Sequence, residues 1–321
     1  MGLVIDGFAH VMPKRCLEAM LKVYPTVELK ELAPLTYFGD MDNRVRVLDK
    51  HGIDKQVLTL GRPSVWLGVP RDILPGLMRL ANDSIVEAAN EHPDRFIPVA
   101  HMPIPTEEYL GEFDRCINEL GMAGIHIVSN IDGKALDAPE FKAFWAKANA
   151  TKAPIWLHPQ LQEDWSQEYV LDKIFGWLYE TSMALARLVF SGVLQEFPDL
   201  RIVTHHMGAM VPHFSERIKG FYDARAIFPR SLFPPLERNP LDYFKRLYGD
   251  TVLNGAVHAM ECGYKFFGTE HNIFATDYPY GPEQGETWMK GALDQVKVID
   301  LPQAEKDMIL GGNLMRLIER R

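Results

Sequence analysis

Eight short apolar runs rich in β-branched residues recur along this chain of 321 residues and constrain its fold more than any other feature. Amphipathic segments of helical length separate the runs, which is the pattern of repeated parallel β/α units. The runs span residues 3–9, 55–60, 95–103, 123–129, 153–159, 200–208, 247–253 and 272–279. Eight strands with helical spacers predict an α/β fold of the (β/α)8 TIM barrel type.

The chain is expected to form a single domain over residues 1–321, because no Gly/Ser linker, low-complexity tract or longer repeat divides it. Two stretches fall outside the regular alternation, at about 13–43 and 216–246. Insertions after barrel strands lie over the face that carries the active site. Both stretches are therefore expected to form pocket walls or subunit contacts.

The formal net charge of −9, with acidic residues scattered along the chain, argues against nucleic-acid binding and favours a small-molecule partner. No apolar run reaches the ~18 residues that a membrane span needs, so no membrane association is expected. The three cysteines, Cys16, Cys116 and Cys262, lie far apart and form no C-x-x-C pair. Since they indicate neither a disulfide framework nor a thiolate metal site, a cytoplasmic protein is predicted.

Metal-binding residue types gather at the predicted strand ends, where barrel enzymes carry their active sites. In chain order these residues are Asp6, His10, His158, His205, His206 and Asp277. Imidazole nitrogens and carboxylate oxygens that converge from separate strands suit a zinc-like divalent ion and leave one position for water or substrate. The pattern predicts a metal-dependent hydrolase or lyase.

Not every histidine is expected to take part. Adjacent side chains on a strand point to opposite faces, so only one of His205 and His206 is expected to enter the barrel. His101 and His126 lie inside strands three and four; either could reach the pocket, but both are interpreted as buried groups with satisfied hydrogen bonds rather than as ligands. Three others precede strands and are expected to be structural or exposed: His51, His92 and His271.

Several motifs, in their order along the chain, resemble the amidohydrolase-2 branch of the amidohydrolase superfamily, which includes aminocarboxymuconate semialdehyde decarboxylase and γ-resorcylate decarboxylase. The motifs are "IDGFAHVMP", "NDSIVEAANEHPDRFIPVAHMPIP", "ELGMAGIHIVSNIDGKALDAPEF", "IWLHP", "ALARLVFSGVLQEFPDLRIVTHHMGAMVPHFSERI", "FATDYPYGPEQG" and "ILGGNLMRLIE". They cover nearly the whole chain, and the resemblance implies the same barrel fold.

The resemblance implies one divalent ion, commonly zinc or manganese, held by an H-x-H or E-x-H pair on strand one, a strand-five histidine and a strand-eight aspartate. The matching residues are His10, His158 and Asp277, whereas Phe8 stands where the first ligand is expected. Three protein ligands still suffice for a catalytic ion. Asp6 or a strand histidine is the alternative source of the missing ligand, and Phe8 is expected to face the substrate.

The resemblance also implies roles in proton transfer and substrate binding. His206 matches the family's general acid/base on strand six, and Asp277 is expected to share that role beside its role as a ligand. His205 is then interpreted as packing between the barrel and a helix. Arg217 matches an arginine that binds a substrate carboxylate across a dimer interface, which predicts a homodimer or higher homo-oligomer. The alternative is that Arg217 is an ordinary surface residue.

The resulting hypothesis is a metal-dependent decarboxylase that acts on an aromatic or unsaturated carboxylic acid without an organic cofactor. The first alternative is a hydrolase of the same fold, in which an activated water attacks a lactone, an amide or a C–C bond. The second alternative is a barrel whose metal site is altered or lost through Phe8.

Overall fold

The computed structural model describes residues 2–162 and 165–319, and each of the eight predicted runs contains strand. Seven runs give one strand each: β1 (Ile5–Val11), β2 (Lys55–Leu60), β5 (Ile125–Val128), β8 (Ile155–His158), β9 (Ile202–Thr204), β10 (Tyr248–Asp250) and β11 (Asn272–Ile273). The run at 95–103 is divided into β3 (Phe96–Pro98) and β4 (Ala100–His101). A short antiparallel hairpin, β6 (Asn130–Ile131) and β7 (Lys134–Ala135), lies outside the barrel strands.

The barrel strands pair in parallel, in the orders β1-β2-β3 and β4-β5-β8-β9-β10-β11. Between the two sheets, the Val99 amide donates to the Leu58 carbonyl at 3.0 Å. At the other junction, the Gly7 amide of β1 donates to the carbonyl of Phe274, the residue after β11, at 2.8 Å. Hydrogen bonds therefore run around the full circle, and the predicted (β/α)8 barrel is confirmed.

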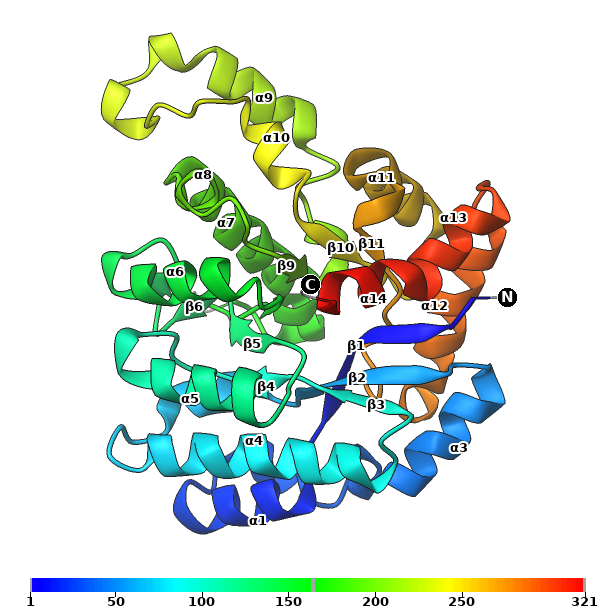
Figure 1. Cartoon of the computed structure of the whole chain (residues 1–321). Coiled ribbons are helices and arrows are strands. Elements are labelled where there is room, and N and C mark those ends of the chain that lie inside the picture. Colours follow the sequence, from blue (N-terminus) through cyan, green and yellow to red (C-terminus); the bar gives the residue numbers. More distant parts are fainter. Residues whose placement is uncertain (1, 163–164, 320–321) are drawn as a thin grey trace.

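Helices surround the strands, as Figure 1 shows. They are α3 (Met41–His51), α4 (Leu74–Glu91), α5 (Leu110–Asp114), α6 (Lys142–Thr151), α7 (Trp177–Phe190), α8 (Val193–Glu196), α11 (Val257–Phe267), α12 (Glu286–Val298) and α13 (Gln303–Asp307). Local sequence sets their ends, as in α3. The Asp40 side chain accepts a hydrogen bond from the Asn43 amide at 2.8 Å at its start, and Gly52 ends it with a left-handed φ of 71°.

The barrel interior has its own apolar cluster, separate from the layer between strands and helices. Its buried members are Ile5, Phe8, Val57, Val99, Trp156, Val203, Val252, Ile273, Ala275, Leu314 and Leu317. The last two belong to α14 (Asn313–Ile318), which packs against the first residues of β1 and β11. Because α14 closes the amino-terminal end of the barrel, only the carboxyl-terminal end is left for a functional site.

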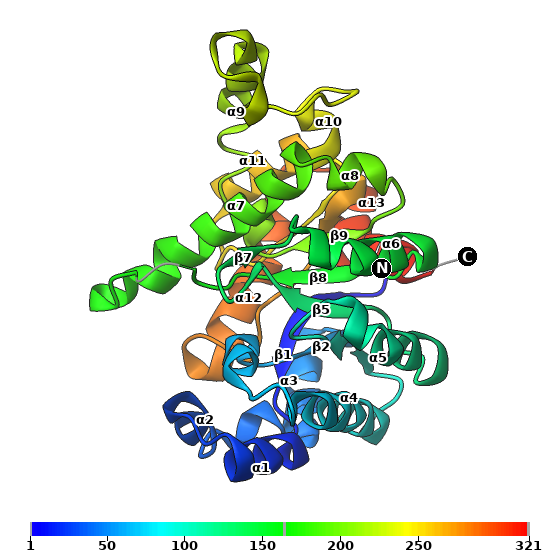
Figure 2. The same ribbon diagram turned by 90° about the vertical axis from the view of Figure 1, so that its left-hand side faces the viewer.

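The two long insertions fold into helices. The first contains α1 (Lys14–Val23), α2 (Val27–Leu32) and a 3₁₀ turn, η1 (Thr36–Phe38). The second contains α9 (Ser215–Asp223), two 3₁₀ turns and α10 (Pro240–Phe244), and both Figure 1 and Figure 2 show α9 standing away from the barrel. In the described parts of the chain, every helix is too short or too polar to cross a membrane.

Candidate active site

A cavity of about 220 Å³ opens at the carboxyl-terminal end of the barrel. Its walls come from α2, the loops after β2, β8 and β11, and the start of α7. The lining residues are Glu28, Arg62, Pro63, Ser64, Val65, His158, Gln160, Leu161, Gln167, Asp172, Lys173, Trp177, Asp277 and Tyr280. This volume is at the small end of ligand pockets, so the cavity suits a ligand of about one ring.

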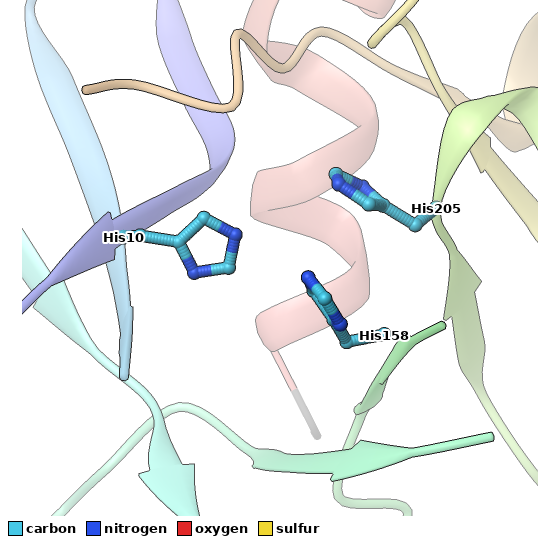
Figure 3. A group of neighbouring side chains, drawn as sticks. All are labelled: His10, His158 and His205. Carbon is cyan, nitrogen blue, oxygen red and sulfur yellow. The ribbon is translucent and has the colours of Figure 1, made fainter. Parts of the chain in front are cut away.

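Three imidazoles converge beside this cavity, and one of them, His158, lines it. His10 lies on β1, His158 ends β8 and His205 follows β9, and Figure 3 shows their rings turned toward one another. One ring nitrogen from each lies within 4.8 Å of the others. All three side chains are buried, so the protein interior holds these rings in place.

Each of these rings has its Nδ1 atom engaged by an acceptor. The Thr59 hydroxyl donates to the Ala9 carbonyl and accepts from His10 Nδ1 at 3.0 Å. His158 Nδ1 donates to the Pro159 carbonyl at 2.7 Å, and His205 Nδ1 donates to Asp250 Oδ2 at 2.5 Å. With Nδ1 protonated, a neutral imidazole presents a bare lone pair on Nε2, which is how proteins orient metal-binding histidines.

Asp277 brings a carboxylate to the same point. Its Oδ1 atom lies 3.1 Å from His10 Nε2 and 3.5 Å from His205 Nε2. Two ligands about 2.1 Å from one tetrahedral ion lie about 3.4 Å apart, so these separations match shared coordination. Lone pairs that face a carboxylate require a cation between them, and His10 Nε2 has no hydrogen-bond partner among the described residues. The donor set therefore fits one divalent ion.

The electrostatics of the free protein reflect this concentration of acceptors. Burial lowers the pKa of His205, but the Asp250 and Asp277 carboxylates outweigh burial and raise it to about 10. Burial acts to raise the pKa of Asp277, yet the neighbouring His10 and His205 side chains hold it well below its usual range. A positive charge is thus favoured among these groups, either as a proton or as a metal ion.

Phe8 lies beneath the imidazoles and offers them no donor atom. Its ring centroid is 4.2 Å from that of His205 and 5.6 Å from that of His10, and the side chain is fully buried. Asp6 does not replace the missing ligand, because its carboxylate accepts hydrogen bonds from Thr276 and Gln56. His205 is the strand-end residue that completes the donor set.

The structure differs from the expected placement of His205. The expectation that His205 packs between the barrel and a helix is wrong, because its ring lies among the metal-type donors. β9 ends at Thr204, and His206 has a left-handed φ of 54°, so strand alternation does not govern both rings. The His206 ring lies 4.0 Å from that of His205 and stacks 6.5 Å from Trp177 of the cavity wall.

Burial, reinforced by the charge on His205, lowers the pKa of His206 to about 3. The catalytic role of His206 stays a prediction.

His101 and His126 were expected to have satisfied hydrogen bonds, and this is wrong. Neither ring nitrogen of either residue has a hydrogen-bond partner among the described residues. Their rings lie 5.6 Å apart, and His126 lies 5.8 Å from both Phe8 and His158. Burial lowers the pKa of His101 to about 3 and that of His126 well below its ordinary value, so both are neutral.

Arg217 does not reach the cavity of its own chain. It is exposed on α9, where its guanidinium lies 4.8 Å from the centroid of the Phe221 ring. No residue of the 216–246 stretch lines the cavity, whereas the 13–43 stretch contributes Glu28. That the 216–246 stretch covers the catalytic face, and that Arg217 binds substrate, stay predictions.

Two residues of the site were not singled out from the sequence. Asp250 ends the seventh strand, and its position alone, in "LYGD", is the signal that marks it. Arg62 follows β2 in the loop over the cavity, and its position directly after a predicted strand is likewise the feature that marks it.

Comparisons with known proteins agree with this geometry. A family model described as amidohydrolase matches residues 40–319. The 2-amino-3-carboxymuconate-6-semialdehyde decarboxylase of Dictyostelium discoideum is 29% identical over 283 residues, which cover 87% of this chain and 76% of that protein.

Two solved structures are also similar. That of 5-carboxyvanillate decarboxylase from Sphingomonas paucimobilis has a TM-score of 0.86 at 23% identity and covers 99% of both chains. That of dihydroxybenzoic acid decarboxylase from Polaromonas sp. JS666, with bound manganese and the inhibitor 2-nitroresorcinol, has a TM-score of 0.81 at 25% identity. It covers 99% of this chain and 97% of its own.

These likenesses confirm the predicted barrel, and the manganese in the Polaromonas protein agrees with the predicted single divalent ion, zinc or manganese. The relatives are named decarboxylases, which supports the predicted carboxy-lyase over the hydrolase. Because the family model matches most of its length, the chain belongs to the amidohydrolase family.

Proposed function

We propose that this chain is a metal-dependent decarboxylase that removes CO₂ from an aromatic or unsaturated carboxylic acid. One observation carries the proposal: ring nitrogens of three histidines and the Asp277 carboxylate lie together beside a cavity of about one-ring size. The decarboxylase names of the relatives support the same reaction.

His10, His158, His205 and Asp277 would hold the ion. A bound divalent ion would supply a Lewis acid that holds the substrate's carboxylate and an adjacent oxygen and balances their charge. Zinc and manganese both accept nitrogen and carboxylate donors, and elemental analysis of the purified protein distinguishes them.

Proton transfer is assigned to Asp277, with His206 as the alternative donor. Asp277 lines the cavity, and the His206 ring stacks on Trp177 in its wall. Asp277 would take an acidic proton that the substrate carries and deliver it to the carbon that bears the carboxylate. The C–C bond then breaks, its electron pair returns to the conjugated system, and CO₂ leaves.

Aromatic side chains would limit the access of water to this carbon. Phe8 fills the space beneath the imidazoles, while Trp177 and Tyr280 form part of the wall. A dry site favours protonation of carbon over attack by water, which is the property that separates a decarboxylase from a hydrolase of the same fold.

A homodimer or higher homo-oligomer is part of the proposal. Helix α7, the segment between β9 and α9, and the 216–246 stretch form an apolar groove, and its lining includes Met183, Ala186, Phe190, Met210, Phe214, Arg217, Ile218, Phe221 and Phe233. Phe214 is 41% exposed and Phe221 46% exposed in the single chain, so a partner subunit would bury apolar surface there. A second chain would also bring Arg217 toward a cavity, and light scattering that finds a monomer would contradict this part.

We place the protein in the cytoplasm. Cys16, Cys116 and Cys262 are all free, and the first two are buried. Free buried thiols are usual in a reducing compartment.

The test is release of CO₂ from a panel of hydroxylated benzoates and muconate-like acids, with and without chelator. His158→Gln should abolish both metal content and CO₂ release. His51→Gln is the matched control, because His51 pairs with Glu286 outside the site and its loss should leave both intact. Metal-free protein that decarboxylates at full rate would contradict the proposal.

A further inference from the structure

Arg62 occupies an unusual position in the cavity wall. It follows Gly61 at the end of β2 and has a left-handed φ of 54°, a backbone conformation that residues other than glycine and asparagine rarely adopt. Two other residues of the site, His206 and Asp277, share this backbone region with φ values of 54° and 62°. Strained backbone conformations are common at functional positions.

The Arg62 side chain has no acidic partner within the parts of the chain that the structure describes. Its Nε atom is buried without a hydrogen-bond acceptor, and none of the ion pairs among the described residues includes it. The other cation that lines the cavity, Lys173, lies 2.7 Å from Asp172 and is already paired. A buried guanidinium nitrogen without an acceptor is costly unless a ligand supplies one.

Tyr280 connects Arg62 to the candidate metal centre. The Arg62 guanidinium lies 5.7 Å from the centroid of the Tyr280 ring, and the same ring lies 5.3 Å from the His10 imidazole. A planar acid in this cavity, with one acidic group at the His10 and Asp277 donors, would direct a second toward Arg62.

We propose that Arg62 binds a second acidic group of the substrate and so selects acids that carry two anionic substituents. The proposal rests on the proposed function, because it places the first acidic group at the metal donors. A guanidinium binds a carboxylate through two parallel charge-assisted hydrogen bonds, which a lysine cannot reproduce. Arg62 belongs to the same chain as the cavity, so this recognition does not depend on Arg217 or on a partner subunit.

Equilibrium binding to the metal-loaded protein tests the proposal, with benzoate, isophthalate and terephthalate as probes in calorimetry. Wild-type protein should bind at least one dicarboxylate about 10- to 100-fold more tightly than benzoate. Arg62→Asn should remove this preference and leave benzoate binding intact. Asparagine tolerates the left-handed backbone, so the variant should melt at or above the wild-type temperature, which excludes misfolding as the cause.

Two further variants sharpen the test. Arg62→Lys keeps the charge and should keep only part of the preference, whereas Lys173→Gln removes the paired cation of the same cavity and should keep all of it. The assignment of Arg62 would be overturned if the preference for a dicarboxylate survived in Arg62→Asn, or if wild-type protein showed no such preference. Neither result would affect the proposed release of CO₂. If none of the three acids binds, the Arg62 assignment is contradicted, whereas the proposed function is tested separately by CO₂ release from the hydroxylated benzoates and muconate-like acids. If Arg62→Asn loses the preference for a dicarboxylate but no acid in the panel releases CO₂, Arg62 would still be supported as the binding group for a second acidic substituent. Only the proposed decarboxylation would then be overturned.

Discussion

Nδ1 of His205 lies 2.5 Å from Oδ2 of Asp250, and both side chains are buried inside the barrel. The other Asp250 oxygen accepts hydrogen bonds from the Met207 amide at 3.4 Å and the Val252 amide at 3.1 Å. Asp250 therefore fixes both the protonation of His205 on Nδ1 and the course of the loop after β9.

Asp250→Asn should weaken divalent metal binding about 10- to 100-fold, because the amide keeps an acceptor but removes the charge that holds His205 in place. Competition with a chelator measures this change. Asp132→Asn is the control, since Asp132 pairs with Arg71 on the surface and its loss should not alter metal affinity. Equal metal affinity in wild-type and Asp250→Asn protein would show that His205 is not a ligand.

His205→Asn and His206→Asn should have different effects although the residues are adjacent. The first removes a donor of the cluster and should lower the metal content per chain. The second leaves the donors intact and should retain the ion while lowering kcat about 10²- to 10⁴-fold, if His206 transfers protons. Elemental analysis and steady-state kinetics on both variants distinguish the two roles. Loss of metal from His206→Asn alone would make His206 the ligand in place of His205.

Phe8→His should tighten metal binding, because the ring lies beside His10 and His205 and would add a nitrogen donor. Phe8→Leu keeps the position apolar and should leave metal affinity unchanged, at a cost of about 1–2 kcal/mol in the free energy of unfolding. Chelator competition and chemical denaturation measure the two quantities. Metal binding in Phe8→His that is weaker than in Phe8→Leu would count against the proposed position of the ion.

Asp6 predicts a specific dependence of stability on pH in the metal-free protein. Burial raises the pKa of Asp6 to about 6, against the opposing effect of hydrogen bonds from Thr276 and Gln56. The folded state binds this proton more tightly than the unfolded state does. Its contribution is therefore fully present below about pH 4 and is lost as the pH rises through about 6.

The difference in unfolding free energy between wild-type and Asp6→Asn protein should shift by about 3 kcal/mol over this range, with wild type losing stability as pH rises. Denaturant titrations at pH 4, 5, 6 and 7 measure it. A difference that is constant with pH would indicate an ordinary Asp6 pKa.

The strands and much of the candidate site could be predicted from the sequence because both depend on local pattern. Each apolar run gave a strand, and position at a strand end was enough to bring His10, His158 and Asp277 together. Parallel strands in a closed barrel place their carboxyl ends at one rim, so the fold itself supplies this proximity.

The errors arose where long-range contacts set the backbone. The choice between His205 and His206 depends on the end of β9 at Thr204 and on the left-handed turn that follows, which Asp250 supports from another strand. Similarly, the register of β1 against β2 shifts between Asp6 and Ala9, and the Asp6 carboxylate accepts hydrogen bonds from Gln56 and Thr276, so Asp6 does not supply the missing ligand. Neither irregularity has a signature in the local residue pattern.

Whether this site protonates carbon and releases CO₂ is measured by running the reaction of an accepted acid in D₂O and, separately, in H₂¹⁸O. A decarboxylase should release stoichiometric CO₂ and place one deuterium on the carbon that lost the carboxylate, with no ¹⁸O in the organic product. Product that contains ¹⁸O and forms without CO₂ would contradict the proposed decarboxylation, because water would then have attacked the substrate.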